Sequence, residues 1–383
     1  MKFLVMTPGV FDKGGIARYG RFQIQALREA FGEEAVEVFS LLGRQDDDLE
    51  TPFRVNWTGA LPLTFGSRAL FSWESARAVR RSRPDVMLTQ LIHLGPLAWA
   101  LARSTGARLV QNIYGSEVWS PISWLRRKAL RRTDLVLSDC HNSADRALDL
   151  GLVRTRPTVV WDCVDIESFN PAPAKPGVLL RYGLRDTGRF RVLFLGRLVA
   201  AARYKGSERL IRLAATLPAT EFEVVFAGKG DDVDHLRSLA QEAGVAEHVQ
   251  FTGAIHEDDL PDVYRSAGAF YLVSEAGTRK GEGIPLAPME AMACGVPVLV
   301  GNQDGSRELL DGGGGLCCGP DEFERQAAYL ERLASDENVR REESAKARRR
   351  VESAFGYAVF AAKTREAFEP LLAGRSRIGR PKG

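Results

Sequence analysis

The sequence is poor in the residues that form metal centres and disulfide frameworks. Its 383 residues include only five cysteines and five histidines. The cysteines show no C-x-x-C spacing, and the adjacent pair Cys317 and Cys318 is poorly placed to form a bridge with itself. The histidines show no H-x-x-x-H spacing. We therefore expect no metal site and a reducing compartment.

Long apolar runs are scarce as well. The longest nearly uncharged run, residues 88–101, is interrupted by His93 and Pro96 and is shorter than the ~18–20 apolar residues that span a bilayer. The apolar stretch at the amino terminus stops at Pro8, which is too short for the core of a secretory signal. These features predict a cytoplasmic protein in which no segment crosses a membrane.

Neither sign of charge dominates, because 52 basic residues stand against 49 acidic ones for a net charge of +3. Such a balance does not suit a protein that coats nucleic acid, so we expect no nucleic-acid partner. Hydrophobic residues at 45% and charged residues at 26% are typical of globular proteins. Because single cores stop growing near ~250–300 residues, the length predicts two domains.

Short apolar runs alternate with amphipathic stretches along the whole chain, which predicts βαβ units and parallel sheets. One series of runs begins at residue 2, and a second begins at Arg191, after a segment with three prolines between residues 171 and 176. We predict an α/β protein with two Rossmann-like, doubly wound domains that face a central cleft. The predicted parts are residues 1–170, a linker at 171–190, a second domain at 191–355, and a carboxyl-terminal helix with a basic tail at 356–383, which packs back on the first domain.

Two glutamates, Glu282 and Glu290, stand eight residues apart around a predicted helix start at residues 286–288. The first turn of a helix has free N–H groups and the positive end of the helix dipole, so an anion fits there. Taken alone, each glutamate is more often a solvated helix residue or an acid that complements the dipole.

A second segment supplies cations. Arg197 follows a predicted strand and Gly196, and Lys205 precedes Gly206 and a predicted helix. A guanidinium fork and an ammonium group at the end of a strand suit a diphosphate.

In combination these motifs resemble the retaining glycosyltransferases of family 4, which have the GT-B fold. The family's E-x7-E motif matches Glu282 and Glu290, and its G-R-L…K-G pair matches residues 196–198 and 205–206. Its amino-terminal glycine loop matches Gly14 and Gly15, and its V-D…F-P stretch resembles residues 164–171. The resemblance covers nearly the whole chain.

The resemblance implies a hexosyltransferase whose donor substrate is a nucleotide-diphosphate sugar and which needs neither cofactor nor metal. It implies that Arg197 and Lys205 hold the diphosphate, Glu282 the hydroxyls of the donor sugar, and Glu290 the ribose. Further donor-binding positions are Gly15, Gly196, Gly230, Gly283, Ile284 and Leu286. The candidates on the acceptor side are Gly14, His93, Tyr114 and Glu117. For the glycines, ordinary turn chemistry is the competing interpretation.

Two departures from the family pattern bear on the site. Pro285 stands where many members have glycine, and proline removes one N–H group from the donor loop. Tyr114 stands where many members have the histidine of an H-G-x-E stretch. With an ordinary pKa near ~10, a tyrosine positions a ligand rather than acting as a base.

The expected chemistry follows from charge, because cleavage of the anomeric bond leaves negative charge on the diphosphate, where preorganised cations stabilise it. We favour a departing phosphate that takes the acceptor proton on the same face over a covalent intermediate. The aspartates at 46–48 and 231–232 are interpreted as solvated loop charges, not as metal ligands. A nucleotide-sugar epimerase and a catalytically silent binding subunit remain alternatives, whereas the absence of G-x-G-x-x-G argues against a dehydrogenase.

Residues 119–132 combine tryptophans with five basic residues between positions 126 and 132. A basic helix with tryptophans at its start can lie on an anionic bilayer. The sequence therefore predicts peripheral binding to the inner face of the cell membrane. The acceptor would then be a lipid-linked sugar or a glycolipid in polysaccharide or cell-envelope biosynthesis. The competing interpretation is a salt-bridged surface helix of a soluble enzyme with a soluble acceptor.

Overall fold

A computed structural model describes residues 1–12, 14–44, 51–60 and 63–373 of the chain. The chain forms two compact units. Unit 1 consists of Met1–Cys163 and of the chain from Tyr357 onward, and unit 2 consists of Val164–Gly356. The first unit is therefore discontinuous in sequence.

The chain enters unit 2 after residue 163, seven residues before the predicted end of the first domain at residue 170. The physical reason is a local pairing: Val164 forms a parallel bridge with Gly356, and its N–H group donates to the carbonyl of Phe355 at 2.9 Å. The first residues after the crossing are thus hydrogen-bonded within unit 2.

Unit 1 contains a seven-stranded, all-parallel sheet with the order β3-β2-β1-β4-β5-β6-β7. Its strands are β1 (Phe3–Gly9), β2 (Val36–Leu42), β3 (Asn56–Gly59), β4 (Val86–Thr89), β5 (Arg108–Ile113), β6 (Leu135–Ser138) and β7 (Thr158–Val159). Its helices are α1 (Gly15–Phe31), η1 (Glu33–Ala35), α2 (Phe65–Ser82), α3 (Gly95–Thr105), α4 (Gly115–Trp119), α5 (Trp124–Leu130), α6 (His141–Asp149) and α14 (Tyr357–Ala373).

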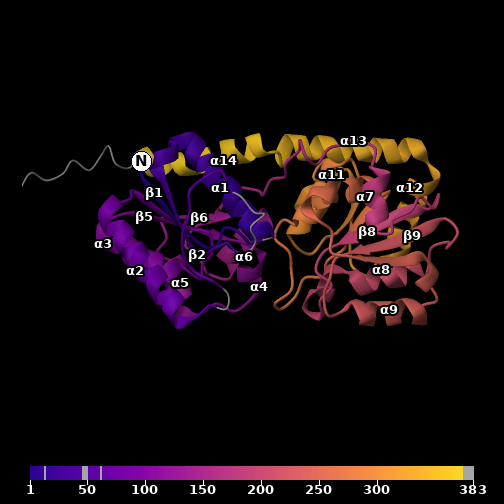
Figure 1. Cartoon of the computed structure of the whole chain (residues 1–383), viewed down its shortest axis with the longest axis horizontal. Helices are drawn as coiled ribbons and strands as arrows, with labels where there is room; N and C mark the ends of the chain where they lie inside the picture. Colours follow the sequence, from indigo (N-terminus) through magenta and orange to yellow (C-terminus); the bar gives the residue numbers. More distant parts are fainter. Residues whose placement is uncertain (13, 45–50, 61–62, 374–383) are drawn as a thin grey trace, which may run out of the picture. The chain divides into compact units, whose positions relative to one another are not determined.

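The central strand β1 is buried on both faces, which explains its continuous apolar sequence. Phe3 and Val5 point into one core cluster, and Leu4 and Met6 point into another. Helices α1 and α14 cover the first face, and α2 and α3 cover the second. Helix α14 lies along α1 (Figure 1), and its Phe368 packs edge-on against Phe3 at 5.7 Å between ring centroids.

Unit 2 contains a six-stranded parallel sheet with the order β10-β9-β8-β11-β12-β13. Its strands are β8 (Phe190–Leu195), β9 (Phe222–Ala227), β10 (Val249–Gly253), β11 (Ala269–Leu272), β12 (Val298–Gly301) and β13 (Gly315–Cys318). Its helices are α7 (Pro176–Arg181), η2 (Ala200–Lys205), α8 (Ser207–Ala214), α9 (Val233–Glu242), η3 (Ala246–His248), η4 (Glu257–Asp259), α10 (Leu260–Arg265), α11 (Leu286–Ala293), η5 (Gly305–Leu310), α12 (Phe323–Ser335) and α13 (Glu337–Ala354).

Residues 171–190, the predicted linker, belong to unit 2 and include α7. Two buried carboxylates hold this segment in place. Asp262 accepts a hydrogen bond from the N–H group of Lys175 at 3.0 Å. Asp259 pairs with the guanidinium of Arg181 at 2.7 Å. Lys175 and Arg181 thus anchor this segment to α10 and η4 of the second unit.

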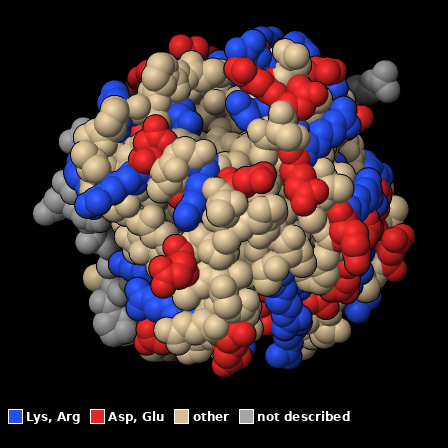
Figure 2. All heavy atoms as spheres, turned by 90° about the vertical axis from the view of Figure 1, so that its right-hand side faces the viewer, with Lys and Arg blue, Asp and Glu red and all other residues tan. Residues whose placement is uncertain are grey.

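The predicted α/β fold class is confirmed, because both units are doubly wound around parallel sheets. The strand order reverses between β1 and β4 in unit 1 and between β8 and β11 in unit 2. Ligands of such sheets bind outside the carboxyl ends of the strands at these reversal points. No helix in the described part of the chain is long and apolar enough to cross a bilayer. Basic and acidic side chains are interspersed over the face shown in Figure 2.

Candidate active site

The reversal point of unit 2 is built on the loop that follows β8. This loop contains η2, and the carbonyl of its Tyr204 accepts from the N–H group of Glu275, which follows β11, at 2.8 Å. Gly206, the next residue, has a φ of 102°, and a Cβ atom there would lie 2.7 Å from the carbonyl oxygen of Val273. Only glycine therefore allows the turn after Lys205 to pack against the chain that follows β11.

Lys205 and Glu282 form the centre of the site. The Nζ atom of Lys205 lies 2.9 Å from Oε1 of Glu282, and the two side chains are 20% and 12% exposed. The phenol of Tyr204 lies close to the Glu282 carboxylate. Burial, and next the negative charge of Glu282, raise the pKa of the Tyr204 phenol, which therefore stays protonated and acts as a donor. Sequence reasoning missed Tyr204, although it is the direct neighbour of Lys205.

Arg197 adds a second cation. Its side chain is exposed beyond the end of β8, and its charge is close enough to Tyr204 to lower the pKa of that phenol. Among residues 1–12, 14–44, 51–60 and 63–373, no carboxylate forms an ion pair with Arg197. The structure thus brings Arg197 and Lys205 to the same end of the sheet as Glu282.

Asp304 holds the backbone of the loop that contains Glu282 through hydrogen bonds. Its carboxylate is fully buried, and Oδ2 accepts hydrogen bonds from the N–H group of Glu282 at 2.9 Å and from the hydroxyl of Ser274 at 2.8 Å. Oδ1 accepts from the N–H group of Ser306 at 3.0 Å. Burial is the main reason that the pKa of Asp304 is raised, the charge of Glu282 adds to the effect, and the hydrogen bonds oppose it.

Helix α11 begins at Leu286, within the predicted range, and no side chain of the described residues caps it. Its first N–H groups lie next to the Glu282 loop in sequence and are suited to an anion. Pro285 is the N-cap residue, with extended backbone angles. Gly283 is partly exposed, whereas Ile284 is buried.

Glu290 has a different environment from Glu282. It is buried on α11, and its Oε2 accepts a hydrogen bond from the hydroxyl of Tyr264, on α10, at 2.7 Å. The structure thus holds this carboxylate against a neighbouring helix of unit 2. The predicted contact between Glu290 and a ribose stays a prediction.

The two other donor-side glycines of unit 2 differ in their surroundings. A Cβ atom at Gly230 would lie 2.0 Å from the carbonyl oxygen of Leu198, so glycine is needed there for the close approach of two loops. A Cβ atom at Gly196 would meet nothing closer than 3.7 Å, at a ring carbon of Phe194.

One interpretation of loop aspartates was wrong. Asp232 was expected to be solvated, but it is buried and accepts from Nε of Arg203 at 2.8 Å through Oδ2. The partner lies 29 residues earlier in the chain, which local sequence reasoning does not reveal. Asp231 is exposed, and residues 46–48 lie outside the described residues. In the described ranges, no group of three or more His, Cys, Asp or Glu side chains is placed to hold a metal ion.

The acceptor-side candidates lie in unit 1, as does Gly15, which was predicted on the donor side. Gly14 is the N-cap residue of α1, and Gly15 is its first residue. His93 follows β4 and is an exposed residue. Desolvation of its partly covered ring, and to a smaller extent the charge of Arg126, lower the pKa of His93. These three positions lie near the carboxyl ends of β1 and β4, where the strand order reverses.

Tyr114 and Glu117 are core residues. The phenol of Tyr114 accepts a hydrogen bond from the Asn112 side chain at 3.1 Å and packs edge-on against Tyr19 at 5.4 Å between ring centroids. Burial raises the pKa of Tyr114 well above its ordinary value. The Glu117 carboxylate accepts from the N–H group of Tyr114 at 3.1 Å and closes a capping box on α4. Both residues therefore shape the end of β5.

Two family models match the chain. The model described as Glycosyl transferases group 1 matches residues 182–350, and the model described as Glycosyl transferase 4-like domain matches residues 14–161. The chain belongs to the family 4 glycosyltransferases, with the GT-B fold. The two matched ranges fall within unit 2 and unit 1 of this glycosyltransferase.

Two curated relatives are informative. The GDP-mannose-dependent alpha-(1-6)-phosphatidylinositol monomannoside mannosyltransferase of Mycolicibacterium smegmatis is 34% identical over 232 residues, which is 57% of this chain and 58% of the relative. The D-inositol 3-phosphate glycosyltransferase 1 of Catenulispora acidiphila is 28% identical over 282 residues, which is 67% of this chain and 63% of the relative. The chain thus spans less than two thirds of the length of either relative.

Solved structures agree with the fold of this glycosyltransferase. HepE of Anabaena, solved in complex with UDP, is 18% identical, with a TM-score of 0.77 over 97% of this chain and 100% of that one. Sucrose-phosphate synthase of Thermosynechococcus elongatus is 19% identical, with a TM-score of 0.79 over 98% of this chain and 100% of that one. At this level of identity the likeness concerns the fold alone.

Proposed function

We propose that this glycosyltransferase moves a hexosyl unit from a nucleotide-diphosphate sugar to an acceptor hydroxyl, with retention of anomeric configuration and without a metal ion. The observation that carries the proposal is the contact of Lys205 with Glu282, at 2.9 Å, beside Arg197 at the carboxyl end of the unit 2 sheet. A carboxylate that can accept from sugar hydroxyls and two cations that can hold a diphosphate thus share one small region.

The proposed chemistry assigns a role to each group. Negative charge develops on the diphosphate as the anomeric bond breaks, and Arg197, Lys205 and the start of α11 stabilise it. Because these groups are held in place before the reaction, little energy is needed to reorganise them. The protonated phenol of Tyr204 is close enough to Glu282 to orient its carboxylate toward the donor sugar. The departing phosphate takes the proton of the acceptor hydroxyl.

For the acceptor we propose a polyol or sugar that bears a phosphate group, free or linked to a lipid. The relative from Mycolicibacterium smegmatis is named for phosphatidylinositol monomannoside, and the relative from Catenulispora acidiphila for D-inositol 3-phosphate. Both names describe a phosphate on a polyol ring. The family match favours neither the epimerase nor the silent binding subunit.

We further propose that unit 1 binds an anionic membrane surface through α5. The side chain of Trp124 is 72% exposed, and Lys128 lies 5.7 Å from the centre of its ring. Arg127 and Arg131 donate to backbone carbonyls of residues 150 and 151. Within the described part of the chain, no carboxylate forms an ion pair with the five basic residues between 126 and 132. Their charges are therefore available to lipid phosphates.

The predicted membrane-binding segment differs from the structure in one respect, and the predicted basic tail cannot be compared with it. The segment is not one helix, because residues 120–123 separate α4 from α5. The basic tail at residues 374–383 lies outside the described residues.

The experiment that tests the proposed activity is a panel of nucleotide sugars, assayed for acceptor-independent hydrolysis and for transfer. Glu282→Gln and Lys205→Ala should each lower turnover by about 10²-fold or more, because the contacts they remove act in the transition state. The matched control is Arg349→Ala, an exposed position on α13 that forms no ion pair with the described residues. Full turnover in either site variant, with an unchanged circular dichroism spectrum, would contradict the proposed site.

A further inference from the structure

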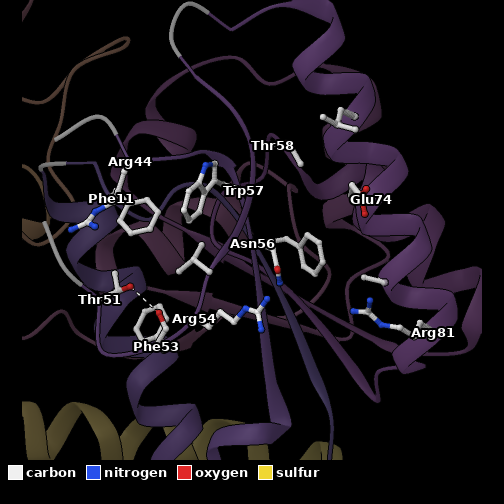
Figure 3. A pocket seen from close by; sticks show the side chains of 14 residues that line it. Phe11, Arg44, Thr51, Phe53, Arg54, Asn56, Trp57, Thr58, Glu74 and Arg81 are labelled. Atoms are coloured by element: carbon white, nitrogen blue, oxygen red, sulfur yellow. Dashed lines mark hydrogen bonds between the residues drawn. The ribbon is translucent and has the colours of Figure 1, made fainter. Parts of the chain in front are cut away.

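A cavity of about 790 Å³ lies in unit 1, between β3 and α2. Figure 3 shows the rings of Phe11 and Trp57 on one side of it and the side chains of Glu74 and Arg81, from α2, on the other. Arg81 already pairs with Glu37, whose carboxylate lies 2.5 Å away. The charged groups of the lining are spread around the cavity, so they indicate no particular ligand.

A largely buried arginine lies in unit 2, close in sequence to a residue assigned to the donor. Arg209 is on α8, four residues after Lys205, and its side chain is only 13% exposed. Its neighbours on the helix, Leu210 and Ile211, are fully buried in the core. A guanidinium group that is mostly withdrawn from water needs hydrogen-bond acceptors within the protein.

The Nη2 group of Arg209 donates to two backbone carbonyls. One is the carbonyl of Tyr204, at 2.8 Å, which belongs to the peptide bond that joins Tyr204 to Lys205. The other is the carbonyl of Val273, at 3.0 Å, in the segment that follows β11. One planar group thus ties the backbone at Lys205 to the chain beyond β11.

Further contacts join the same two segments. The carbonyl of Tyr204 also accepts from the N–H group of Glu275 at 2.8 Å. The carboxylate of Glu275 lies 3.5 Å from Nη1 of Arg209. Gly206 has no side chain to displace the Val273 carbonyl, from which a Cβ atom would lie only 2.7 Å away. The backbone on both sides of the lysine is therefore held in place.

Lys205 depends on such support because its side chain is flexible. An ammonium group is a point charge on a four-carbon stem, so its position depends on where the backbone places that stem. In the structure, Nζ of Lys205 lies 2.9 Å from Oε1 of Glu282. A shift of the lysine backbone by about 1 Å would alter this contact and move the charge away from a bound diphosphate.

We propose that Arg209 is a positioning residue for Lys205: its guanidinium fork holds the lysine backbone against the segment after β11 and so places the ammonium group for the diphosphate of the donor. The inference rests on the proposed function, because Arg209 acts only through the lysine that binds the diphosphate. Arg209 itself touches no substrate. A lysine at position 209 would keep the positive charge, but it lacks the planar fork that donates to two carbonyls at once.

The test measures the binding of UDP, GDP, ADP and dTDP to the full chain by calorimetry, well below the melting temperature of each variant. A nucleoside diphosphate carries the phosphates that Lys205 is proposed to hold, and it needs no acceptor. The variants are Arg209→Met, Arg209→Lys, Lys205→Ala, and the double variant of Arg209→Met with Lys205→Ala. Arg212→Met is the matched control, because Arg212 is an exposed residue of the same helix that pairs with Glu208 at 3.9 Å.

We expect Arg209→Met to raise the Kd of the nucleoside diphosphate that the wild type binds by about tenfold, and Lys205→Ala to raise it by at least as much. Because Arg209 acts through Lys205, Arg209→Met should cause no further increase when combined with Lys205→Ala. Arg209→Lys should resemble Arg209→Met, and Arg212→Met should resemble the wild type. A residue that only stabilises the fold would lower the melting temperature without this dependence on Lys205.

Glu275→Gln covers the case in which circular dichroism shows that Arg209→Met does not fold. The Glu275 side chain is 44% exposed, and the change removes only the negative charge beside the guanidinium. We expect this variant to raise the Kd about two- to threefold, and to have no effect when combined with Lys205→Ala. An unchanged Kd in Glu275→Gln would in that case overturn the inference.

Three other results would overturn it: an unchanged Kd in a folded Arg209→Met, additive effects of Arg209→Met and Lys205→Ala, or wild-type binding in Arg209→Lys. Each of these rejects the positioning role alone, provided that the wild type binds a nucleoside diphosphate and Lys205→Ala weakens that binding. If the wild type binds none of the four and hydrolyses no nucleotide sugar, the proposed function fails, and the inference fails with it.

Discussion

Asp304→Asn tests whether the buried carboxylate beneath the Glu282 loop positions that loop or merely stabilises the fold. In the variant, the amide oxygen replaces Oδ1 and still accepts from Ser306. The amide nitrogen replaces Oδ2 and can donate to the Ser274 hydroxyl, but it cannot accept from the N–H group of Glu282. Only that backbone bond, 2.9 Å long in the wild type, is lost outright.

Asp304→Asn has two opposing effects on stability: it removes one hydrogen bond, and it removes a buried charge. A buried N–H group without an acceptor costs about 1–3 kcal/mol. The raised pKa of Asp304 means that burial of its charge costs more than its hydrogen bonds return, and asparagine removes that cost. We therefore expect a small change in melting temperature at neutral pH. Because Glu282 loses its anchor, we expect kcat/KM to fall by about 10- to 100-fold, as misplacement by about 1 Å does elsewhere.

The same pKa shift gives the sign of a pH dependence. The pKa of Asp304 is raised above its ordinary value of 3.8. The folded protein therefore binds the Asp304 proton more tightly than the unfolded chain does. Its contribution to stability is therefore full below pH 3.8 and is lost as the pH rises through the raised value. Asp304→Asn has no carboxylate to ionise and therefore lacks this loss. The melting temperature of the variant relative to that of the wild type should thus be higher at neutral pH than in acid.

The assay combines steady-state kinetics with thermal melts of Asp304→Asn and of Ser274→Ala, which removes only one of the three donors. The serine variant should lose less activity than the asparagine variant, because the Glu282 bond is retained. Wild-type kcat/KM in Asp304→Asn would refute the positioning role. A large drop in melting temperature, with a loss of activity that only matches the loss of folded protein, would mean that Asp304 stabilises the fold instead.

Three further outcomes are expected. Transfer should persist in EDTA, because the proposed cations are Arg197 and Lys205; inhibition that Mg²⁺ or Mn²⁺ reverses would contradict this. Tyr264→Phe removes the hydroxyl that donates to buried Glu290 and should lower the free energy of unfolding by about 1–3 kcal/mol, measured by urea denaturation; unchanged stability would mean that other partners suffice. Sedimentation with liposomes should increase with anionic lipid, decrease with salt and weaken in Trp124→Ala; equal recovery in the supernatant with neutral and anionic liposomes would exclude membrane binding through α5.

The sequence is informative where a signal is local. Alternating apolar runs predict the strands because each strand of a parallel sheet is buried on both faces. The start of α11 is predicted within residues 286–288 because proline and helix formers mark it. The contact of Glu117 with the N–H group of Tyr114, three residues earlier, is also local, but tyrosine is not the serine or threonine that marks a capping box in a sequence.

The sequence does not predict the contacts between segments that lie far apart in the chain. Asp304 follows β12 and meets Glu282, 22 residues earlier, only because their loops lie at the same end of the sheet. Asp232 and Arg203 are 29 residues apart, which explains why a buried ion pair was interpreted as loop charge. The cavity beside Trp57 likewise combines residues of β2, β3 and α2 with Phe11, which follows β1.

The return of the chain to unit 1 at α14 has a consequence during synthesis. Unit 2 is continuous and has its full sequence once residue 356 has been made, whereas unit 1 then still lacks its last helix. The face of α1 that contacts α14, together with the ring of Phe3, stays uncovered while roughly 190 further residues are added. At about 5–20 residues per second that interval lasts about 10–40 s. During that time, unit 1 on the ribosome exposes an apolar surface that chaperones recognise and that favours aggregation.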